Sequence, residues 1–384
     1  MKVVHLTSVH SPHDGRIFEK ECKSLAQFGY EVVLVAPGKQ YETRDGVRIE
    51  AVPKVSSRIV RMMHTVWKLY RRALECNADV YHLHDPELIP IGLLLRVHGK
   101  QVVYDVHEDL PRTIQNKEYL PRLLRFPVSV ACAWFERLTL RYFTAIVAAT
   151  REIGIRARRF NANTVVVNNF PVISKKGVPC LPWAERKLQV AYVGAITEAR
   201  GIRELVQAMA LLPESVPMRL ALAGPVMPPE FLSDLSQLDG WKRVDWLGTL
   251  DHGQVVELLA ESRAGLVVLH PAPNYVCSWP TKLFEYMLAG LPVIASDFPV
   301  WREIVSRARC GLLVNPLAPA EIASAIEQVF AKPAFANAMG ARGRQAVTDA
   351  YNWGSESRAL GDLYRRLEPP QPRAAASSTV SHVA

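Results

Sequence analysis

Short apolar runs alternate with longer amphipathic stretches through the first half of the chain. Residues 2–6 and 31–36 predict buried strands, and residues 14–29 predict a helix that begins near Asp14 and ends at Gly29. Further strands are predicted at 79–84, 101–107, 145–150 and 164–169. Strands that alternate with helices in this way are typical of a parallel sheet with helices on both faces.

The alternation of apolar runs and amphipathic stretches is interrupted by one polar segment and then resumes. Residues 173–186 are polar and contain Pro and Gly, which is typical of a linker. Beyond the linker, helices are predicted at 201–212 and 319–332, between the apolar runs LQVAYVG, RLALAGP, VDWLG, AGLVVLH and PVIAS. We therefore predict two doubly wound α/β halves, with ligands at the carboxyl ends of their strands.

Composition narrows the class of protein. With 384 residues, 49% of them hydrophobic, the chain can form two cores, and its net charge of +9 indicates an anionic partner. The six cysteines are widely spaced without a CxxC motif, which predicts neither a disulfide framework nor a zinc site. The N-terminus reads as neither a signal peptide nor a membrane span, so we expect a cytoplasmic protein. The Pro/Ala/Ser-rich tail 369–384 is predicted to be disordered.

The stretch SWPTKLFEYMLAGLPVIASD, residues 278–297, predicts a short helix between Pro280 and Gly290 that is followed by a buried strand. Its core-facing stripe is Leu283, Phe284, Met287 and Leu288. Glu285 falls on the other face, as does Lys282 three residues earlier. A solvated Glu285–Lys282 pair is the ordinary interpretation, and a ligand-binding carboxylate is the alternative.

The loop between Gly194 and Gly201 joins a predicted strand to a predicted helix. Such a loop presents backbone N–H groups and the positive end of a helix dipole, and Arg200 adds a guanidinium suited to phosphate. The loop is neither GxGxxG nor a P-loop, which disfavours dinucleotide oxidoreductases and P-loop NTPases. An ordinary turn with a solvated Arg200 is the alternative.

Histidine and acidic residues follow three predicted strands of the first half. They are His10, His13, Asp14, His84, Asp85, His107 and Glu108. A parallel sheet would gather them at one rim, where they could hydrogen-bond to sugar hydroxyls or phosphate. Because no HExxH or comparable spacing occurs, we predict no metal site. Purely structural roles remain the alternative.

Two segments combine basic and apolar residues. Residues 56–72 predict a basic amphipathic helix that carries Arg58, Arg61, Lys68, Arg71 and Arg72. Residues 122–143 are strongly apolar, but their charged residues disfavour a membrane span. Both segments could dock on anionic lipid, or they could be core-packed helices with solvated basic faces.

Several separated motifs together resemble the GT-B retaining glycosyltransferases of family 4. They are YVGAITEARGI, PTKLFEYMLAGLPVIASD, DGRIFEKECKSLAQFGYEV and YNWGSESRALGDLYRRL. The resemblance extends over nearly the whole chain up to the tail. It implies Rossmann-like domains at 1–172 and 187–350 that face each other across a cleft, and a C-terminal helix at 351–367 that crosses back to the first domain.

The resemblance also implies roles for individual residues. Glu285 matches the second Glu of the family's E-x7-E motif, which holds the donor ribose, and His107 resembles the histidine near the transferred sugar. Arg200 matches the Lys of an Arg…Lys pair that grips the donor diphosphate. The chain departs from the family at Cys277, Ala195 and HSPHDG (10–15), which replace the first Glu, the Arg and a glycine pair. The candidate catalytic residues are His107 and Arg200, the donor-binding residues are Gly194, Arg200, Gly201, Lys282 and Glu285, and the sugar or acceptor contacts are His13, Asp14, Gly15, His84, Cys277 and Ser278.

The activity implied by the resemblance is transfer of a sugar, with retention of configuration, from a UDP- or GDP-sugar to a glycan or lipid-linked acceptor in cell-surface polysaccharide assembly. Neither a cofactor, a metal nor a nucleic acid is expected to take part. The location would be the cytoplasm, with peripheral attachment to the inner face of the membrane through 56–72 and 122–143. A nucleotide-sugar epimerase and a non-catalytic glycan-binding protein are the alternatives.

Overall fold

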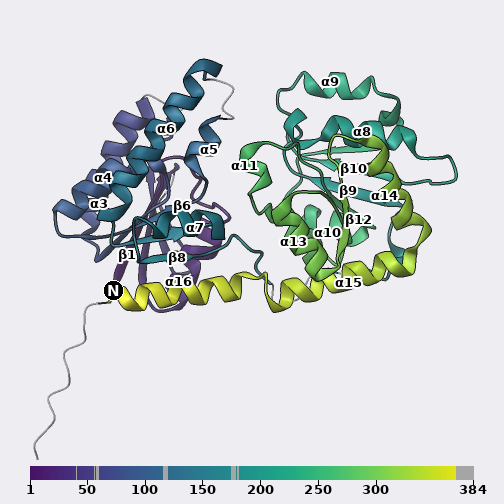
Figure 1. Cartoon of the computed structure of the whole chain (residues 1–384). Coiled ribbons are helices and arrows are strands. Elements are labelled where there is room, and N and C mark those ends of the chain that lie inside the picture. Colours follow the sequence, from purple (N-terminus) through teal and green to yellow (C-terminus); the bar gives the residue numbers. More distant parts are fainter. Residues whose placement is uncertain are drawn as a thin grey trace, which may run out of the picture.

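The chain folds into two α/β domains that lie side by side, with a long helical segment running along both (Figure 1). This computed structural model describes residues 1–39, 41–55, 57, 60–115, 120–173, 179 and 181–368. The predicted tail 369–384 and part of the predicted linker lie outside the described residues.

The first domain contains an eight-stranded sheet in the order β3-β4-β2-β1-β5-β6-β7-β8. All neighbouring strands are parallel except β3 and β4. The strands are β1 (Lys2–Leu6), β2 (Glu31–Pro37), β3 (Glu42–Arg44), β4 (Val47–Val52), β5 (Val80–Leu83), β6 (Gln101–Val106), β7 (Ala145–Ala148) and β8 (Thr164–Val166). The six predicted strands are confirmed. Strands β3 and β4 were not predicted; β3 is fully exposed and carries no apolar pattern, whereas β4 is mostly buried.

Helices cover both faces of this sheet. They are η1 (Ile17–Cys22), α1 (Lys23–Gln27), η2 (Arg61–Thr65), α3 (Val66–Cys76), η3 (Pro86–Leu88), α4 (Ile89–Val97), α5 (Leu110–Gln115), α6 (Arg122–Thr139), η4 (Leu140–Tyr142) and α7 (Arg151–Arg158). The helix predicted at 14–29 begins with the π-helical turn η1, and Gly29 terminates it with φ of +91°. π-Helical turns are frequent near functional sites, and this one follows the loop that comes after β1.

The second domain contains a six-stranded parallel sheet in the order β11-β10-β9-β12-β13-β14. Its strands are β9 (Gln189–Val193), β10 (Arg219–Ala223), β11 (Val244–Gly248), β12 (Ala264–Val267), β13 (Val293–Ser296) and β14 (Gly311–Val314). Its helices are η5 (Trp183–Glu185), η6 (Glu198–Arg200), α8 (Ile202–Leu211), α9 (Phe231–Ser236), η7 (Asp239–Arg243), α10 (His252–Glu261), α11 (Pro273–Val276), α12 (Thr281–Leu288), α13 (Pro299–Ala308), α14 (Pro319–Ala331) and α15 (Pro333–Asp349). The strand order reverses between β9 and β12, where ligands of doubly wound sheets bind. The prediction of two doubly wound domains is confirmed.

The last helix, α16 (Trp353–Leu367), returns to the first domain, as predicted (Figure 1). Its apolar face, which includes Leu360 and Leu363, joins the first domain's core beside Val3 and Val32. The Trp353 indole N–H also donates a hydrogen bond to Ser24 Oγ at 2.8 Å. The first domain is therefore completed by the end of the chain.

Candidate active site

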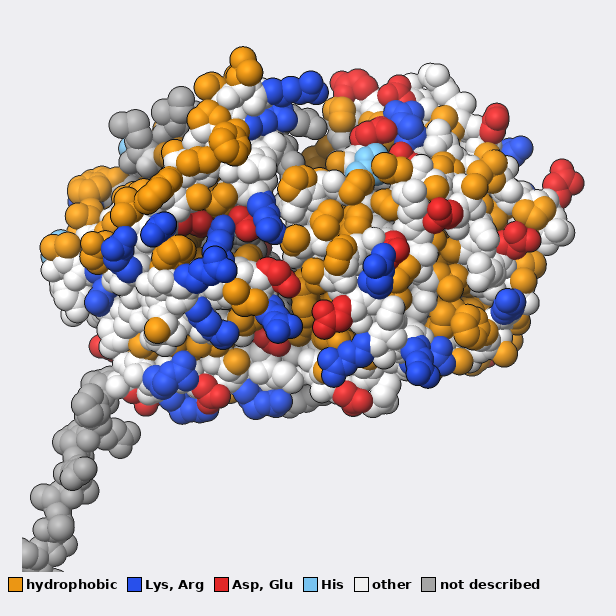
Figure 2. Space-filling view, viewed as in Figure 1, with side chains coloured by type: hydrophobic (Ala, Val, Ile, Leu, Met, Phe, Trp, Pro, Cys, Tyr) orange, Lys and Arg blue, Asp and Glu red, His pale blue; other side chains and the backbone are white. Residues whose placement is uncertain are grey.

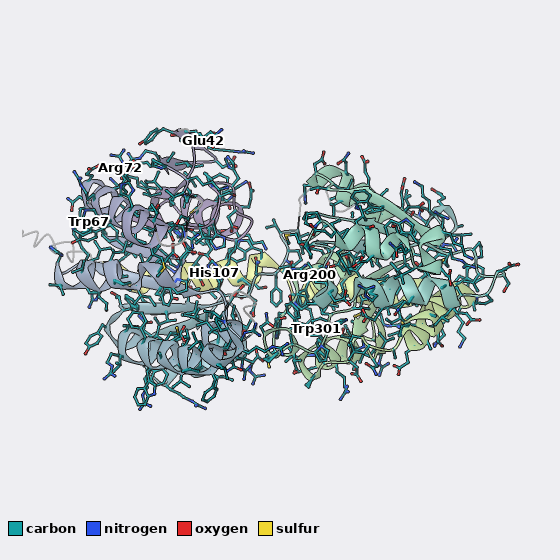
Figure 3. The ribbon with its side chains drawn as sticks, turned by 90° about the horizontal axis from the view of Figure 1, so that it is seen from above. Glu42, Trp67, Arg72, His107, Arg200 and Trp301 are labelled. Carbon is teal, nitrogen blue, oxygen red and sulfur yellow. The ribbon has the colours of Figure 1, made fainter. Side chains whose placement is uncertain are left out.

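A cleft of about 590 Å³ lies between the two domains and is lined by both. In Figure 3, His107 of the first domain and Arg200 of the second lie on opposite sides of the gap between the domains. The predicted site residues that line the cleft are Asp14, Gly15, His107, Arg200, Cys277, Ser278, Lys282 and Glu285. The fold thus brings most of the predicted site together from distant parts of the chain.

Helix α12 supplies the two charged residues that the sequence analysis singled out. Glu285 is exposed at the cleft, whereas Lys282 is buried, and the two side chains interact through their charges without an ion pair within 4 Å. Loss of hydration raises the pKa of the Glu285 carboxyl, and the positive charges of Lys20 and Lys282 oppose that rise. The ordinary interpretation, a solvated pair with Lys282, is therefore wrong.

Lys282 is only 9% exposed although it was placed on the outer face of the helix. Its Nζ lies 3.8 Å from the centre of the Tyr192 ring and has no hydrogen-bond partner among the described residues. Burial, followed by the charge of Arg200, lowers the pKa of Lys282 to about 7. A buried ammonium group with free N–H donors is suited to an anion that enters the cleft.

The loop after β9 brings Arg200 to the same place. Gly194 has φ of +139°, and a Cβ on this residue would lie 2.7 Å from Lys282 Nζ and 3.2 Å from Arg200 Nη1. Gly201, with φ of +68°, precedes α8 and packs against the Val268 carbonyl. Two cations therefore converge at the N-terminus of a ten-residue helix, an arrangement that binds phosphate groups.

On the first-domain side, His107 is held from behind by Asp105. His107 Nε2 lies 2.7 Å from Asp105 Oδ2, so Nε2 carries the hydrogen and Nδ1 is left as an acceptor. Arg16 donates two hydrogen bonds to the same carboxylate, each at 2.9 Å. Burial would raise the pKa of Asp105, but Arg16 and His107 hold it well below its ordinary value.

The sequence analysis missed the roles of Arg16, Asp105 and Lys20. The only available signal for Asp105 was its position two residues before His107 on a predicted strand, which places both side chains on one face. Lys20 lines the cleft and donates a 2.6 Å hydrogen bond to Asn169 Oδ1. Burial lowers the pKa of Lys20 to about 8, although the charge of Glu285 opposes this.

The loop after β1 is built around Asp14. Its carboxylate accepts hydrogen bonds from the backbone N–H groups of Arg16 at 2.8 Å and Ile17 at 2.9 Å, which start the helical turn. Burial opposes ionisation of Asp14, but its hydrogen bond with His10 and those backbone N–H groups lower its pKa. Gly15 follows at the cleft surface.

Two predicted sugar or acceptor contacts lie elsewhere. His13 Nε2 lies 3.1 Å from Glu42 Oε1 and does not line the cleft. His84 is buried behind His107, with the two facing nitrogens 3.2 Å apart. Neither residue is placed for direct contact with a ligand in the cleft, which corrects that part of the prediction. Sequence proximity to a strand end did not reveal which side chains turn inward.

At the cleft surface of the second domain, Cys277 and Ser278 precede α12. The Trp301 indole N–H donates a 2.7 Å hydrogen bond to the Ser278 carbonyl, and Ser278 Oγ donates to the Tyr275 carbonyl at 3.0 Å. These contacts hold this turn in place. Cys277 occupies the cleft position for which the family resemblance implied a carboxylate.

Two of the four described basic residues predicted for segment 56–72 form ion pairs. Arg61 forms an ion pair with Glu87 at 2.8 Å, and Arg72 pairs with Glu50 and Glu75. Arg58 lies outside the described residues. Only Lys68 and Arg71 among the predicted basic residues are without an ion pair in the described part of this segment.

Helix α6 turns its apolar side outward, which is the reverse of a core-packed helix. Its buried residues are the polar Ser129, Glu136 and Thr139. Its exposed residues, with their exposed fractions, include Leu123 (90%), Phe126 (70%), Trp134 (55%) and Leu138 (50%). Figure 2 shows this hydrophobic surface together with Lys and Arg side chains. Within the described ranges, no helix is both long and apolar enough to span a membrane.

Comparison with known proteins agrees with this architecture. The family description "Glycosyl transferases group 1" matches residues 179–346, and "Glycosyl transferase 4-like domain" matches residues 15–169. An uncharacterized glycosyltransferase of Methanocaldococcus jannaschii is 23% identical over 95% of this chain and 98% of its own.

Solved structures share the fold along almost the whole chain. Sucrose-phosphate synthase from Thermosynechococcus elongatus superposes with a TM-score of 0.77 at 20% identity, over 95% of this chain and 98% of that one. Anabaena HepE, solved with UDP-glucose, has a TM-score of 0.72 at 15% identity, over 95% of this chain and 100% of that one. The two domains and the family matches together define a GT-B glycosyltransferase. The chain belongs to the family 4 type of these enzymes.

Proposed function

We propose that this enzyme transfers a sugar, with retention of configuration, from a UDP- or GDP-sugar to a glycan or lipid-linked acceptor in cell-surface polysaccharide assembly. The observation that carries the proposal is the buried Lys282 ammonium, which has no hydrogen-bond partner among described residues and lies beside Arg200. A nucleoside diphosphate would supply the anion that this pair lacks.

The residues on the two sides of the cleft would have different roles in the reaction. Arg200, Lys282 and the N-terminus of α8 would stabilise the negative charge that develops on the leaving diphosphate. Glu285 would accept hydrogen bonds from the donor ribose. His107, with its hydrogen fixed on Nε2 by Asp105, would present Nδ1 to a hydroxyl of the transferred sugar. The donor phosphate would take up the acceptor proton, because retention needs the incoming hydroxyl on the face that the diphosphate leaves.

The Anabaena structure supports a uridine nucleotide as the first donor to test, since its ligand is UDP-glucose. The test is calorimetry with a panel of UDP- and GDP-sugars, followed by NMR of the product formed with glycan and lipid-linked acceptors. We expect one nucleotide class to bind and the product to keep the donor's anomeric configuration. Absence of binding by any nucleotide sugar would refute the proposal. An epimerised sugar formed from donor alone would favour the epimerase alternative.

We also propose that α6 docks on an anionic membrane that carries the acceptor. The support is its outward apolar stripe together with the arginines among it, since the Arg137 guanidinium lies 5.1 Å from the Trp134 ring centre. Aromatic and aliphatic side chains beside cations are typical of helices that lie in the lipid interface. Segment 56–72, in which Arg61 and Arg72 are already paired with carboxylates, would contribute less than was predicted from its sequence.

Cosedimentation with vesicles of anionic or neutral lipid, at low and high salt, tests this second proposal. A variant with Leu123, Phe126, Trp134 and Leu138 changed to Ser should lose binding. The matched control changes Lys68 and Arg71 to Gln and should keep most of it. Equal binding by the α6 variant and the wild type would refute the assignment of the surface to α6.

A further inference from the structure

A cluster of metal-ligating side chains lies within the first domain, behind the cleft. It consists of His5 on β1, Glu21 on η1, and His82 and His84 on and after β5. Their side chains are completely buried or nearly so. One potential ligand atom from each residue lies within 4.8 Å of those of the other three. Strand pairing creates part of this cluster, because His5 and His82 are direct neighbours in the parallel register of β1 and β5.

Several polar atoms of the cluster lack partners. His5 Nε2, His82 Nε2 and Glu21 Oε2 are buried without a hydrogen bond among the described residues. Each unsatisfied buried polar atom costs on the order of 1–3 kcal/mol, so three of them in one place call for an occupant. His5 Nδ1 lies 2.8 Å from His84 Nε2. That is a hydrogen-bond distance, and since two nitrogens on one tetrahedral zinc ion lie about 3.3 Å apart, the pair would separate slightly when an ion binds.

The other nitrogens of two histidines are already held. His82 Nδ1 lies 2.9 Å from the Tyr364 hydroxyl, and His84 Nδ1 lies 3.4 Å from Asp105 Oδ2. Metal-binding histidines are usually oriented in this way, with one nitrogen on the ion and the other on a hydroxyl, carbonyl or carboxylate. The surroundings therefore match those of a metal ligand set.

The charges of the cluster are also unbalanced. The Arg16 guanidinium forms its paired hydrogen bonds with Asp105 and also approaches Glu21 Oε1 at 3.1 Å. One buried arginine thus faces two buried carboxylates, and because burial and the charge of Asp105 raise the pKa of Glu21, its proton would have to leave when an ion binds. Buried charges are normally paired or bound to metal.

We propose that His5, Glu21, His82 and His84 bind a divalent transition-metal ion, for which Zn²⁺ is the occupant favoured by three imidazoles and one carboxylate. The ion joins β1, β5 and η1, and through Tyr364 it also fixes α16. The site was not predicted from the sequence because all four of its ligands are on predicted strands or helices, at spacings that match no zinc motif. None of the four ligands lines the donor cleft, although His84 contacts His107 at 3.2 Å, so a failure to bind metal leaves the proposed glycosyl transfer untouched.

The experiment uses the full-length, tag-free chain, dialysed against Zn²⁺ and then against metal-free buffer, with metal content measured by mass spectrometry. We expect one zinc per chain in the wild type and a clear loss in His82→Gln and Glu21→Gln. The matched control is His98→Gln, because His98 is an exposed residue after α4 and should have no effect. Circular dichroism checks that each variant is folded.

Cobalt gives a readout that does not depend on the variants. Co²⁺ bound to the wild type by this ligand set should show visible absorption of a four-coordinate site, and excess Zn²⁺ should remove it. Retention of no zinc by the wild type would overturn the proposal and leave a water molecule or a proton on Glu21 as the occupant. Zinc content equal in all variants and the wild type would overturn it as well.

Discussion

If Lys282 grips the donor diphosphate, donor affinity must fall as the pH rises above 7. Burial and Arg200 lower the pKa of Lys282 to about 7 in the free enzyme, so half of the molecules carry a neutral amine at that pH. Only the ammonium form can pair with the diphosphate. A bound diphosphate would raise the pKa again, and each donor bound above pH 7 would therefore take up a proton.

The size of the effect follows from the protonated fraction of Lys282. That fraction is about one half at pH 7 and about one hundredth at pH 9 for a pKa of about 7. Because apparent affinity scales with the competent fraction, the donor Kd should rise about fiftyfold, or by about 2 kcal/mol, between these pH values. Between pH 6 and 7 the change should be only about twofold.

Calorimetry from pH 6 to 9 measures this dependence, and repeating it at pH 8 in two buffers of different ionisation enthalpy counts the protons taken up. Lys20, whose pKa burial lowers to about 8, also lines the cleft and titrates in this range. The variant Lys282→Arg isolates the effect, because a guanidinium stays charged throughout. Lys282→Met should bind the donor weakly at every pH.

Two results would refute this reasoning. One is a donor Kd in the wild type that does not change between pH 7 and 9. The other is an unchanged pH dependence in Lys282→Arg, which would assign the titration to Lys20 or another group. A flat profile in Lys282→Arg beside a steep wild-type profile supports the assignment.

Three further changes test neighbouring parts of the site. Glu285→Gln should weaken donor binding by about 1–3 kcal/mol in calorimetry, because a charge-assisted hydrogen bond to the donor is lost. The melting temperature should stay unchanged, because the carboxylate is exposed. Unchanged donor binding would exclude the ribose role of Glu285. Arg200→Ala should lower turnover on the order of 10²-fold, more than it weakens binding, and equal losses in both would show that the contact forms already in the ground state. Gly194→Ala should cost about 1–3 kcal/mol of stability through its φ of +139° and should displace Lys282. Its control, Gly15→Ala, has no neighbour within 4 Å of the new Cβ and should melt like the wild type.

The two doubly wound domains could be predicted because parallel strands buried on both faces leave continuous apolar runs. The edge strand β3 could not, because its residues are exposed and its only neighbour in the sheet is β4. The outward stripe of α6 was also beyond prediction. Periodicity identifies an amphipathic helix but does not say which face is buried, and α6 buries Ser129, Glu136 and Thr139 instead of its apolar side.

Site residues that lie within a short motif could be predicted from the sequence. Site residues that depend on a contact between distant parts of the chain could not. Pro280 and Gly290 bound α12, so the placement of Glu285 at a cleft follows from local sequence together with the family resemblance. Arg16 and Asp105 are 89 positions apart in the chain, yet their hydrogen bonds hold the carboxylate that orients His107. No sequence window contains such a pair.

Ala195, where the chain departs from the family, gives a second example of a contact that local sequence does not reveal. It concerns the cations that would bind the donor diphosphate. The resemblance placed one cation at position 200 and left the other missing, because alanine stands where an arginine was implied. In the structure, the Lys282 ammonium reaches the same loop from α12 and packs against Gly194, next to Arg200. A side chain at position 195 is therefore not needed to bring two cations to one diphosphate. The price is burial, since Lys282 must stay next to Arg200 without an ion-pair partner among the described residues until the donor arrives, with only the more distant charge of Glu285 to favour its ammonium form. The fold therefore places the Lys282 ammonium next to Arg200 before the donor binds. Because this position is buried, the pKa of Lys282 is lowered and donor binding depends on pH.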